Sequence, residues 1–143
     1  MDADDKINLG FVVNVESAVN FDVDFHLDSD EINSKAFYLE YTYTDDGSYE
    51  VGRAYRVRLK GIAIRRDISQ KNKRLLSQAA TELKNIINRS GGFLHYQIDG
   101  IDVFNRIIAT FYDPVTNQCL NDLLLQPKYA PVFRVYHNNA GRS

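Results

Sequence analysis

Three cations, Arg56, Arg58 and Lys60, alternate with apolar residues along one segment of the chain. Successive residues of a strand point to opposite faces of a sheet, so these side chains would lie on one face. A guanidinium offers planar, paired donors that suit a phosphate and need no metal ion. The pattern predicts either a phosphate-binding strip or only the solvated face of a barrel. Arg65 and Arg66 follow shortly after, and they would enlarge the strip into a cationic patch.

Acidic residues alternate in a second segment, where Asp22, Asp24 and His26 are interleaved with apolar residues. Carboxylates and imidazole bind several divalent ions, which makes this trio a candidate metal site. Strand alternation also produces such triplets by default, and we favour a polar surface face. Arg106 follows a predicted turn at 99–104 and comes four residues after Asp102, and the pair suits a structural ion pair at least as well as ligand binding.

The composition restricts the class of protein. The chain has 143 residues and a net charge of -2, so we expect one globular domain over residues 1–143 with short flexible termini. This net charge gives no general attraction to nucleic acid, and a nucleic-acid site must be a local patch. The single cysteine cannot form an internal disulfide, the N-terminus does not resemble a signal peptide, and no apolar run is long enough to span a membrane. We expect an intracellular protein, cytoplasmic or nuclear, with no membrane partner.

Two hydrophobic periodicities occur along the chain. Alternation predicts strands at residues 11–15, 21–27, 37–44, 49–62, 93–98 and 105–112, and a last extended piece at 132–136. Apolar residues recur every three or four positions over 75–87, which predicts an amphipathic helix. Residues 119–126 predict a short second helix. Asp46-Gly47 predicts a tight hairpin turn, because glycine tolerates a positive φ. Short strands wrapped with helices favour a mainly β fold, an OB-type barrel of five strands, over a sandwich or a parallel sheet.

One stretch of sequence carries a family resemblance. The segment Tyr55-Arg-Val-Arg-Leu-Lys-Gly-Ile62, the amphipathic helix after it, and Asp102-x-x-x-Arg106 entering an apolar strand resemble the staphylococcal-nuclease family. The order of elements agrees over about residues 11–136. The longer stretch at 28–49 implies an enlarged hairpin inserted into that fold.

The resemblance implies roles for several residues. Arg58 and Arg106 are similar to the family's phosphate-binding arginines, and Asp24, with Asp22 beside it, is similar to the first metal-binding carboxylate. An active member of the family would hold calcium or another divalent cation there.

The chain departs from the family pattern where the other carboxylates belong. Ala63 stands at a metal-binding Asp, and Arg66 stands at the Glu thought to help activate water. Asp67 is the next residue, and a shifted register would return a carboxylate to the site. Replacing an anionic ligand and adding a cation should weaken calcium binding, so no cofactor is expected unless the site is active.

Three functions follow, in order of preference. The first is a nuclease-like domain with weak or absent phosphodiester hydrolysis that binds a protein partner, or binds nucleic acid or another phosphate-containing ligand through Arg56, Arg58, Lys60, Arg65, Arg66 and Arg106. The second is an active, metal-dependent DNA or RNA nuclease that uses Asp22, Asp24 and Asp67. The third is a structural or assembly protein that self-associates through an exposed edge strand.

Overall fold

The computed structural model describes residues 8–27, 32 and 34–137. Most of the termini expected to be flexible, and residues 28–31 and 33 of the 28–49 stretch, lie outside these residues. The strands are β1 (Leu9–Ser17), β2 (Asn20–Asp24), β3 (Tyr38–Asp45), β4 (Ser48–Leu59), β5 (Ile62–Ile64), β6 (Phe93–Ile101), β7 (Ile107–Tyr112) and β8 (Phe133–Val135). The helices are α1 (Arg74–Arg89), the single turn α2 (Leu120–Leu123) and two 3-10 turns at Gln70–Asn72 and Pro127–Tyr129.

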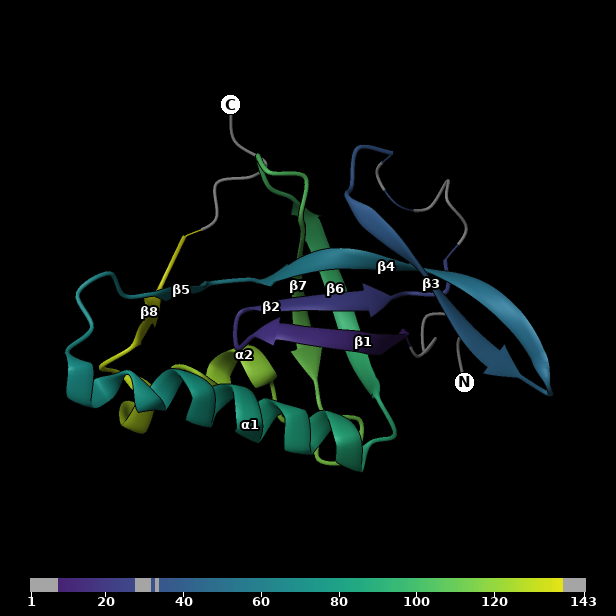
Figure 1. Ribbon diagram of the computed structural model, residues 1–143. Coiled ribbons are helices and arrows are strands. Elements are labelled where there is room, and N and C mark those ends of the chain that lie inside the picture. Colours follow the sequence, from purple (N-terminus) through teal and green to yellow (C-terminus); the bar gives the residue numbers. More distant parts are fainter. Residues whose placement is uncertain (1–7, 28–31, 33, 138–143) are drawn as a thin grey trace.

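Strands β1, β2, β4, β7 and β6 follow one another around a closed barrel (Figure 1). β2 pairs with both β1 and β4, and the second of these pairings closes the ring. β4 and β7 run parallel, whereas the other neighbours are antiparallel. A mixed barrel with a helix between its third and fourth strands is consistent with an OB-type barrel. The predicted mainly β class and five-stranded barrel are therefore confirmed.

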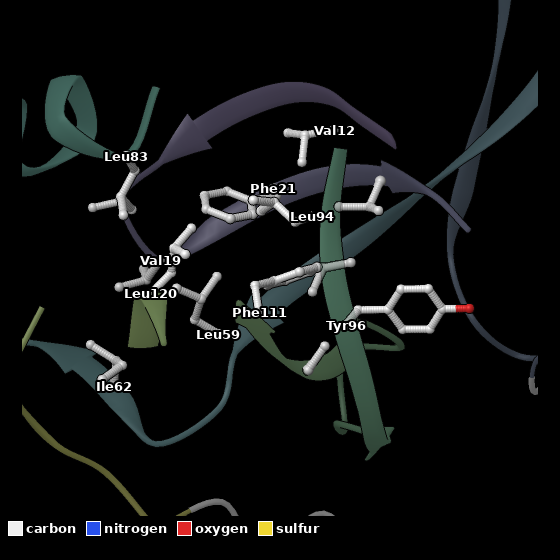
Figure 2. Packing of buried hydrophobic residues seen from close by; sticks show 14 of the residues in the cluster. Val12, Val19, Phe21, Leu59, Ile62, Leu83, Leu94, Tyr96, Phe111 and Leu120 are labelled. Carbon is white, nitrogen blue, oxygen red and sulfur yellow. The ribbon is translucent and has the colours of Figure 1, made fainter. Parts of the chain in front are cut away.

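The barrel interior is filled by apolar side chains that alternate along the strands. Phe21, Leu59, Leu94 and Phe111, from four different strands, are fully buried and converge in Figure 2. The rings of Phe21 and Phe111 lie 5.5 Å apart, centroid to centroid. Leu83 on α1 joins this cluster, as the helical periodicity predicts. Each such side chain contributes about 1.5–3 kcal/mol by leaving water, so this core fixes the strands that carry the site.

β3 and the first half of β4 form a hairpin that extends beyond the barrel (Figure 1). Asp46 and Gly47 both have positive φ, 51° and 81°, which two-residue turns of this kind require. The predicted Asp-Gly turn is confirmed, and it joins β3 to β4 in a hairpin. No helix in the described part of the chain has the length and apolar character needed to cross a membrane.

A separate two-stranded ribbon, β5 and β8, adjoins the barrel. The prediction that residues 49–62 form one strand is wrong, because Gly61 turns the chain with a φ of 82° and β5 begins after it. The predicted helix at 119–126 is only one α-helical turn. A 3-10 turn that begins at Pro127 follows it, so the helical pattern is divided between two short elements.

Candidate phosphate-binding site

Arg58 lies on the outer face of β4 and is half-buried. Its Nη2 donates to the carbonyl oxygen of Ile62 at 3.2 Å, and its guanidinium carbon lies 4.8 Å from the centroid of the Tyr136 ring. Its Nε is buried and has no hydrogen-bond partner among the described residues. Buried polar groups are nearly always satisfied in folded proteins, so this donor marks a place where an acceptor is missing.

Arg106 lies just before β7 and is held by the preceding turn. Its Nε and Nη2 both donate to one Asp102 carboxylate oxygen at 2.8 Å. The other Asp102 oxygen accepts the backbone N–H groups of Phe104 and Arg106. The predicted structural ion pair is confirmed. It fixes the guanidinium 5.1 Å from the centroid of the Phe104 ring, on a turn whose apolar tip is exposed.

A third guanidinium, from Arg134 on β8, completes a cluster with Arg58 and Arg106. Burial lowers the pKa of Arg58 first of all, and the positive charges of Arg106 and Arg134 lower it further. Tyr136 and Asp102 act in the opposite direction but do not offset this. We call Arg58, Arg106 and Arg134 the arginine cluster. Like charges gathered around a desolvated guanidinium make this region favourable for an anion.

Arg134 and Tyr136 were missed in the sequence, where residues 132–136 were treated only as a last extended piece. Arg134 and Tyr136 are two positions apart, a spacing that puts both side chains on one face of a strand and could have identified them. The structure agrees, because the Arg134 guanidinium lies 5.7 Å from the Tyr136 ring centroid. The pairing of Ala63 with Arg134 holds β8 beside β5 and so brings this face to the end of β4.

The other predicted phosphate-binding cations have acceptors of their own. Arg56 pairs with Asp22 at 2.5 Å and with Glu16 at 3.0 Å. Lys60 pairs with Asp99 at 3.4 Å. These contacts leave Arg56 and Lys60 less available to a ligand than Arg58. Arg56 and Arg58 share the predicted face of β4, whereas Lys60 lies in the turn after the strand.

Arg65 and Arg66 lie beyond β5, away from the β4 face. The Nε of Arg65 donates to the carbonyl oxygen of Ala130 at 2.7 Å. Arg65, Arg66, Asp67 and Arg134 line a surface cavity of about 280 Å³. Asp67 therefore lies among arginines rather than beside Asp22 and Asp24.

Asp22 and Asp24 are only 6% and 7% exposed, so the preferred interpretation of a polar surface face is wrong for them. Asp22 accepts hydrogen bonds from Arg56 and from the side chain of Asn14. Asp24 accepts one from the hydroxyl of Tyr41 at 2.8 Å and one from the backbone N–H of His26. Asp22 and Asp24 do lie on one face of β2, as the alternation predicted. That face is covered by side chains from β4 and β3.

In the described structure, neither aspartate pairs with an arginine of the cluster, and Asp24 lies far from it. Arg58 lies opposite Asn20 on β2, and Asp22 lies opposite Arg56. Asp24 lies against Gly52, which is six residues before Arg58 on β4 and therefore roughly 20 Å from it at the usual rise of a strand.

The carboxylates do not form the donor set that a hard cation prefers. Asp22 and Asp24 are each engaged by a side-chain donor, and Ala63 is buried on β5. Within residues 8–27, 32 and 34–137 no three His, Cys, Asp or Glu side chains are grouped closely enough to hold a metal ion. Calcium prefers six to eight oxygen ligands, and this arrangement does not fit such a cage.

Comparison with protein-family models, curated proteins and solved structures gave no match to this chain. The staphylococcal-nuclease family therefore stays a resemblance based on residues. What the geometry itself supplies is an OB-type barrel with an arginine cluster beside the end of β4.

Cys119 has no features of a nucleophile. Burial raises the pKa of its thiol, the Asp122 carboxylate raises it further, and the backbone hydrogen bonds of Asp122 and Asn121 do not reverse the shift. The thiol is then protonated at neutral pH, whereas the thiolate is the reactive form.

Proposed function

We propose that the protein binds nucleic acid through the arginine cluster and hydrolyses phosphodiesters weakly or not at all. The observation that carries the proposal is Arg58, a desolvated guanidinium with a partnerless buried Nε and two further arginines close to it. Such a site costs folding free energy without an anion and is favourable when a phosphate supplies the acceptors.

Aromatic rings beside the cluster favour nucleic acid over a simple anion. Tyr136 lies against Arg58 and Arg134, and Phe104 lies against Arg106. Both rings are accessible, with Phe104 71% exposed and Tyr136 37% exposed. Bases stack on such rings in sequence-tolerant binding of single strands. OB-type barrels bind oligonucleotides on a comparable strand face with its adjacent loops.

We expect no efficient hydrolysis because the acidic residues do not form a catalytic set. Hydrolysis in a site of this kind needs a metal ion held by carboxylates and a carboxylate that orients water. Asp22 and Asp24 are already hydrogen-bonded to Arg56 and Tyr41, and Arg66 stands where the resemblance places the Glu. The arginines remain useful for binding alone.

The test is binding and cleavage of labelled single-stranded and double-stranded DNA and RNA, with calcium, magnesium, manganese or a chelator. We expect binding without cleavage, affinity that falls as salt rises, and a loss of about tenfold or more in Arg58→Ala and Arg106→Ala, the usual effect of removing a hydrogen bond to a charged group. Arg74→Ala is the matched control, because Arg74 is exposed on α1 and its guanidinium donates to the side chain of Gln78. Metal-dependent cleavage that both cluster variants abolish would replace this proposal with the nuclease, and unchanged affinity would remove the cluster from it.

A second candidate, assembly, is favoured by the exposed apolar side chains of the hairpin. Tyr49 is 84% exposed and Val51 is 62% exposed. β3 ends the order of the six-stranded sheet, so its outer edge pairs with no strand in the described part of the chain.

A further inference from the structure

The cavity between β5 and β8 is a separate feature beside the arginine cluster. Arg65, Arg66 and Asp67 follow β5 directly, and Arg134 comes from β8. The backbone N–H of Arg65 donates to the carbonyl oxygen of Val132 at 2.8 Å, and its Nε donates to Ala130. These hydrogen bonds join the segment after β5 to the segment before β8 and so hold the two sides of the cavity together.

The charges in the cavity favour an anion. Three guanidiniums and one carboxylate line it, and no ion pair joins Asp67 to any of the three arginines in the described structure. Arg134 also belongs to the arginine cluster, so the cavity continues the surface on which the phosphates are proposed to bind. Arginine forks of this kind recognise phosphate.

Asp67 favours a ligand that carries hydrogen-bond donors as well as negative charge. An ionised carboxylate can only accept hydrogen bonds, and it repels a bare phosphate or sulfate. A ligand that carries hydroxyl donors near a phosphate would satisfy Asp67 and the arginines together. Ribose is such a donor, and carboxylates bind ribose hydroxyls in dinucleotide sites.

The size of the cavity agrees with a nucleotide unit. Its volume of about 280 Å³ is near the lower end of the roughly 300–1,000 Å³ found for small-molecule sites. An inorganic phosphate would leave most of that space empty, whereas a phosphate with its sugar would occupy more of it.

We propose that this cavity binds one ribonucleotide unit of RNA, with the phosphate on Arg66 and Arg134 and a ribose hydroxyl donating to Asp67. The consequence is a preference for RNA over DNA, because the 2′-hydroxyl is the group that distinguishes them. This proposal rests on the proposed function, since it assigns a further subsite on the same nucleic-acid surface.

The experiment measures the affinity of single-stranded RNA, DNA and 2′-O-methyl RNA of one sequence by fluorescence anisotropy. For the wild type we expect RNA to bind about tenfold more tightly than DNA, the effect of one hydrogen bond to a charged group. The 2′-O-methyl strand should bind like DNA, because it has no 2′ donor. Asp67→Ala should weaken RNA binding and leave DNA binding equal or stronger, since it removes both an acceptor and a repulsive charge.

Variants separate this proposal from the proposed function. Arg66→Ala and Arg134→Ala should weaken RNA and DNA alike, and Arg74→Ala should change neither. Equal affinity of wild type for RNA and DNA, or an RNA preference that survives Asp67→Ala, would overturn the ribonucleotide subsite while leaving the arginine cluster in place. No binding of any strand by the folded wild type would overturn both.

Discussion

Arg56 and Arg58 are two residues apart on one face of β4, yet their surroundings differ. Arg56 lies opposite Asp22 and forms an ion pair with it. Arg58 lies opposite Asn20, and the nearby charges of Arg106 and Arg134 add to burial in lowering its pKa more than Tyr136 and Asp102 raise it. The first is therefore positioned to stabilise the folded protein, and the second is the arginine for which we propose an anionic ligand.

These two arginines should respond in opposite ways to substitution. Arg56→Ala leaves Asp22 buried without its cation, and we expect a loss of about 2 kcal/mol of unfolding free energy, less than for a fully buried pair because Arg56 is partly exposed. Arg58→Met keeps the volume and removes a charge whose lowered pKa shows that folding disfavours it, so stability should be unchanged or higher. Urea denaturation measures both effects, and anisotropy should show nucleic-acid binding lost in Arg58→Met. A large destabilisation by Arg58→Met would assign Arg58 a structural role.

Asp113 is a structural carboxylate whose charge belongs to the folded state. Burial alone would raise its pKa, but hydrogen bonds from Val115 and Thr116 and the Arg89 ion pair hold the pKa below the usual 3.8. A lowered folded pKa gives a stability contribution that is present above the unfolded pKa and is lost as pH falls below it. We expect unfolding free energy to fall below about pH 5 and on through the folded pKa. Asp113→Asn should reduce the unfolding free energy at neutral pH by roughly 2 kcal/mol. It should also make the unfolding free energy depend less on pH in the acid range. Thermal melts across pH would measure both effects. An unchanged pH dependence in the acid range would contradict the assignment.

The elements differ in how far they could be predicted. The helix over 74–89 and the Asp46-Gly47 turn depend on local periodicity and local backbone preference, and both were predicted. The extended piece at 132–136 was predicted and contains β8. Its pairing with β5 was not predicted, because β5 has only three residues and no local pattern shows which strand it joins. The Asp22–Arg56 pair joins residues separated by 34 positions, so it depends on the β2–β4 register, which no local pattern sets.

Gly52 permits the close contact between the hairpin and β2. A Cβ at this position would lie 2.6 Å from an Asp24 carboxylate oxygen and 2.7 Å from a carbon of the Tyr41 ring. Gly52→Ala should displace the Tyr41 hydroxyl from Asp24 and lower unfolding free energy by about 1–3 kcal/mol, since a buried acceptor loses its partner. Tyr41→Phe removes the same hydrogen bond without the clash, so the double variant should cost less than the sum of the two. Strict additivity in denaturant melts would show that the clash acts elsewhere.

The charge of the whole molecule is distributed unevenly. The chain has a net charge of -2, but the arginine cluster and the cavity adjoin the β5–β8 ribbon, and Asp45, Asp46 and Glu50 lie at the tip of the hairpin, which extends away from that ribbon (Figure 1). The charges in the sequence could predict that a local cationic patch exists, but not which residues form it. Of the cations predicted to bind phosphate, the structure gathers Arg58 with Arg106, and it brings in Arg134 through a distant strand.

The outer edge of β3 is where we expect the molecule to self-associate if it assembles. The two-residue turn closes on the pair Asp45 and Ser48, so Glu40, Thr42 and Thr44 direct their backbone N–H and C=O groups outward. β3 contains neither proline nor lysine, the residues that usually protect an edge. Two copies can pair antiparallel about Thr42, which places Tyr41 of one copy opposite Tyr43 of the other and sets no like charges directly opposite.

We expect a dimer at high protein concentration that added salt does not dissociate, because backbone hydrogen bonds and tyrosine contacts hold it. Thr42→Pro removes an outward N–H without breaking the β3–β4 ladder, and Thr42→Lys adds a charge to the same edge. Sedimentation velocity should show the wild type shifting toward dimer with concentration and both variants remaining monomeric. Arg74→Ala is again the control and should dimerise like the wild type. If the wild type stays monomeric throughout, or if both edge variants still dimerise, β3 is not an assembly edge. The exposed hairpin residues Tyr49 and Val51, 84% and 62% exposed, would then have to be covered by a different partner.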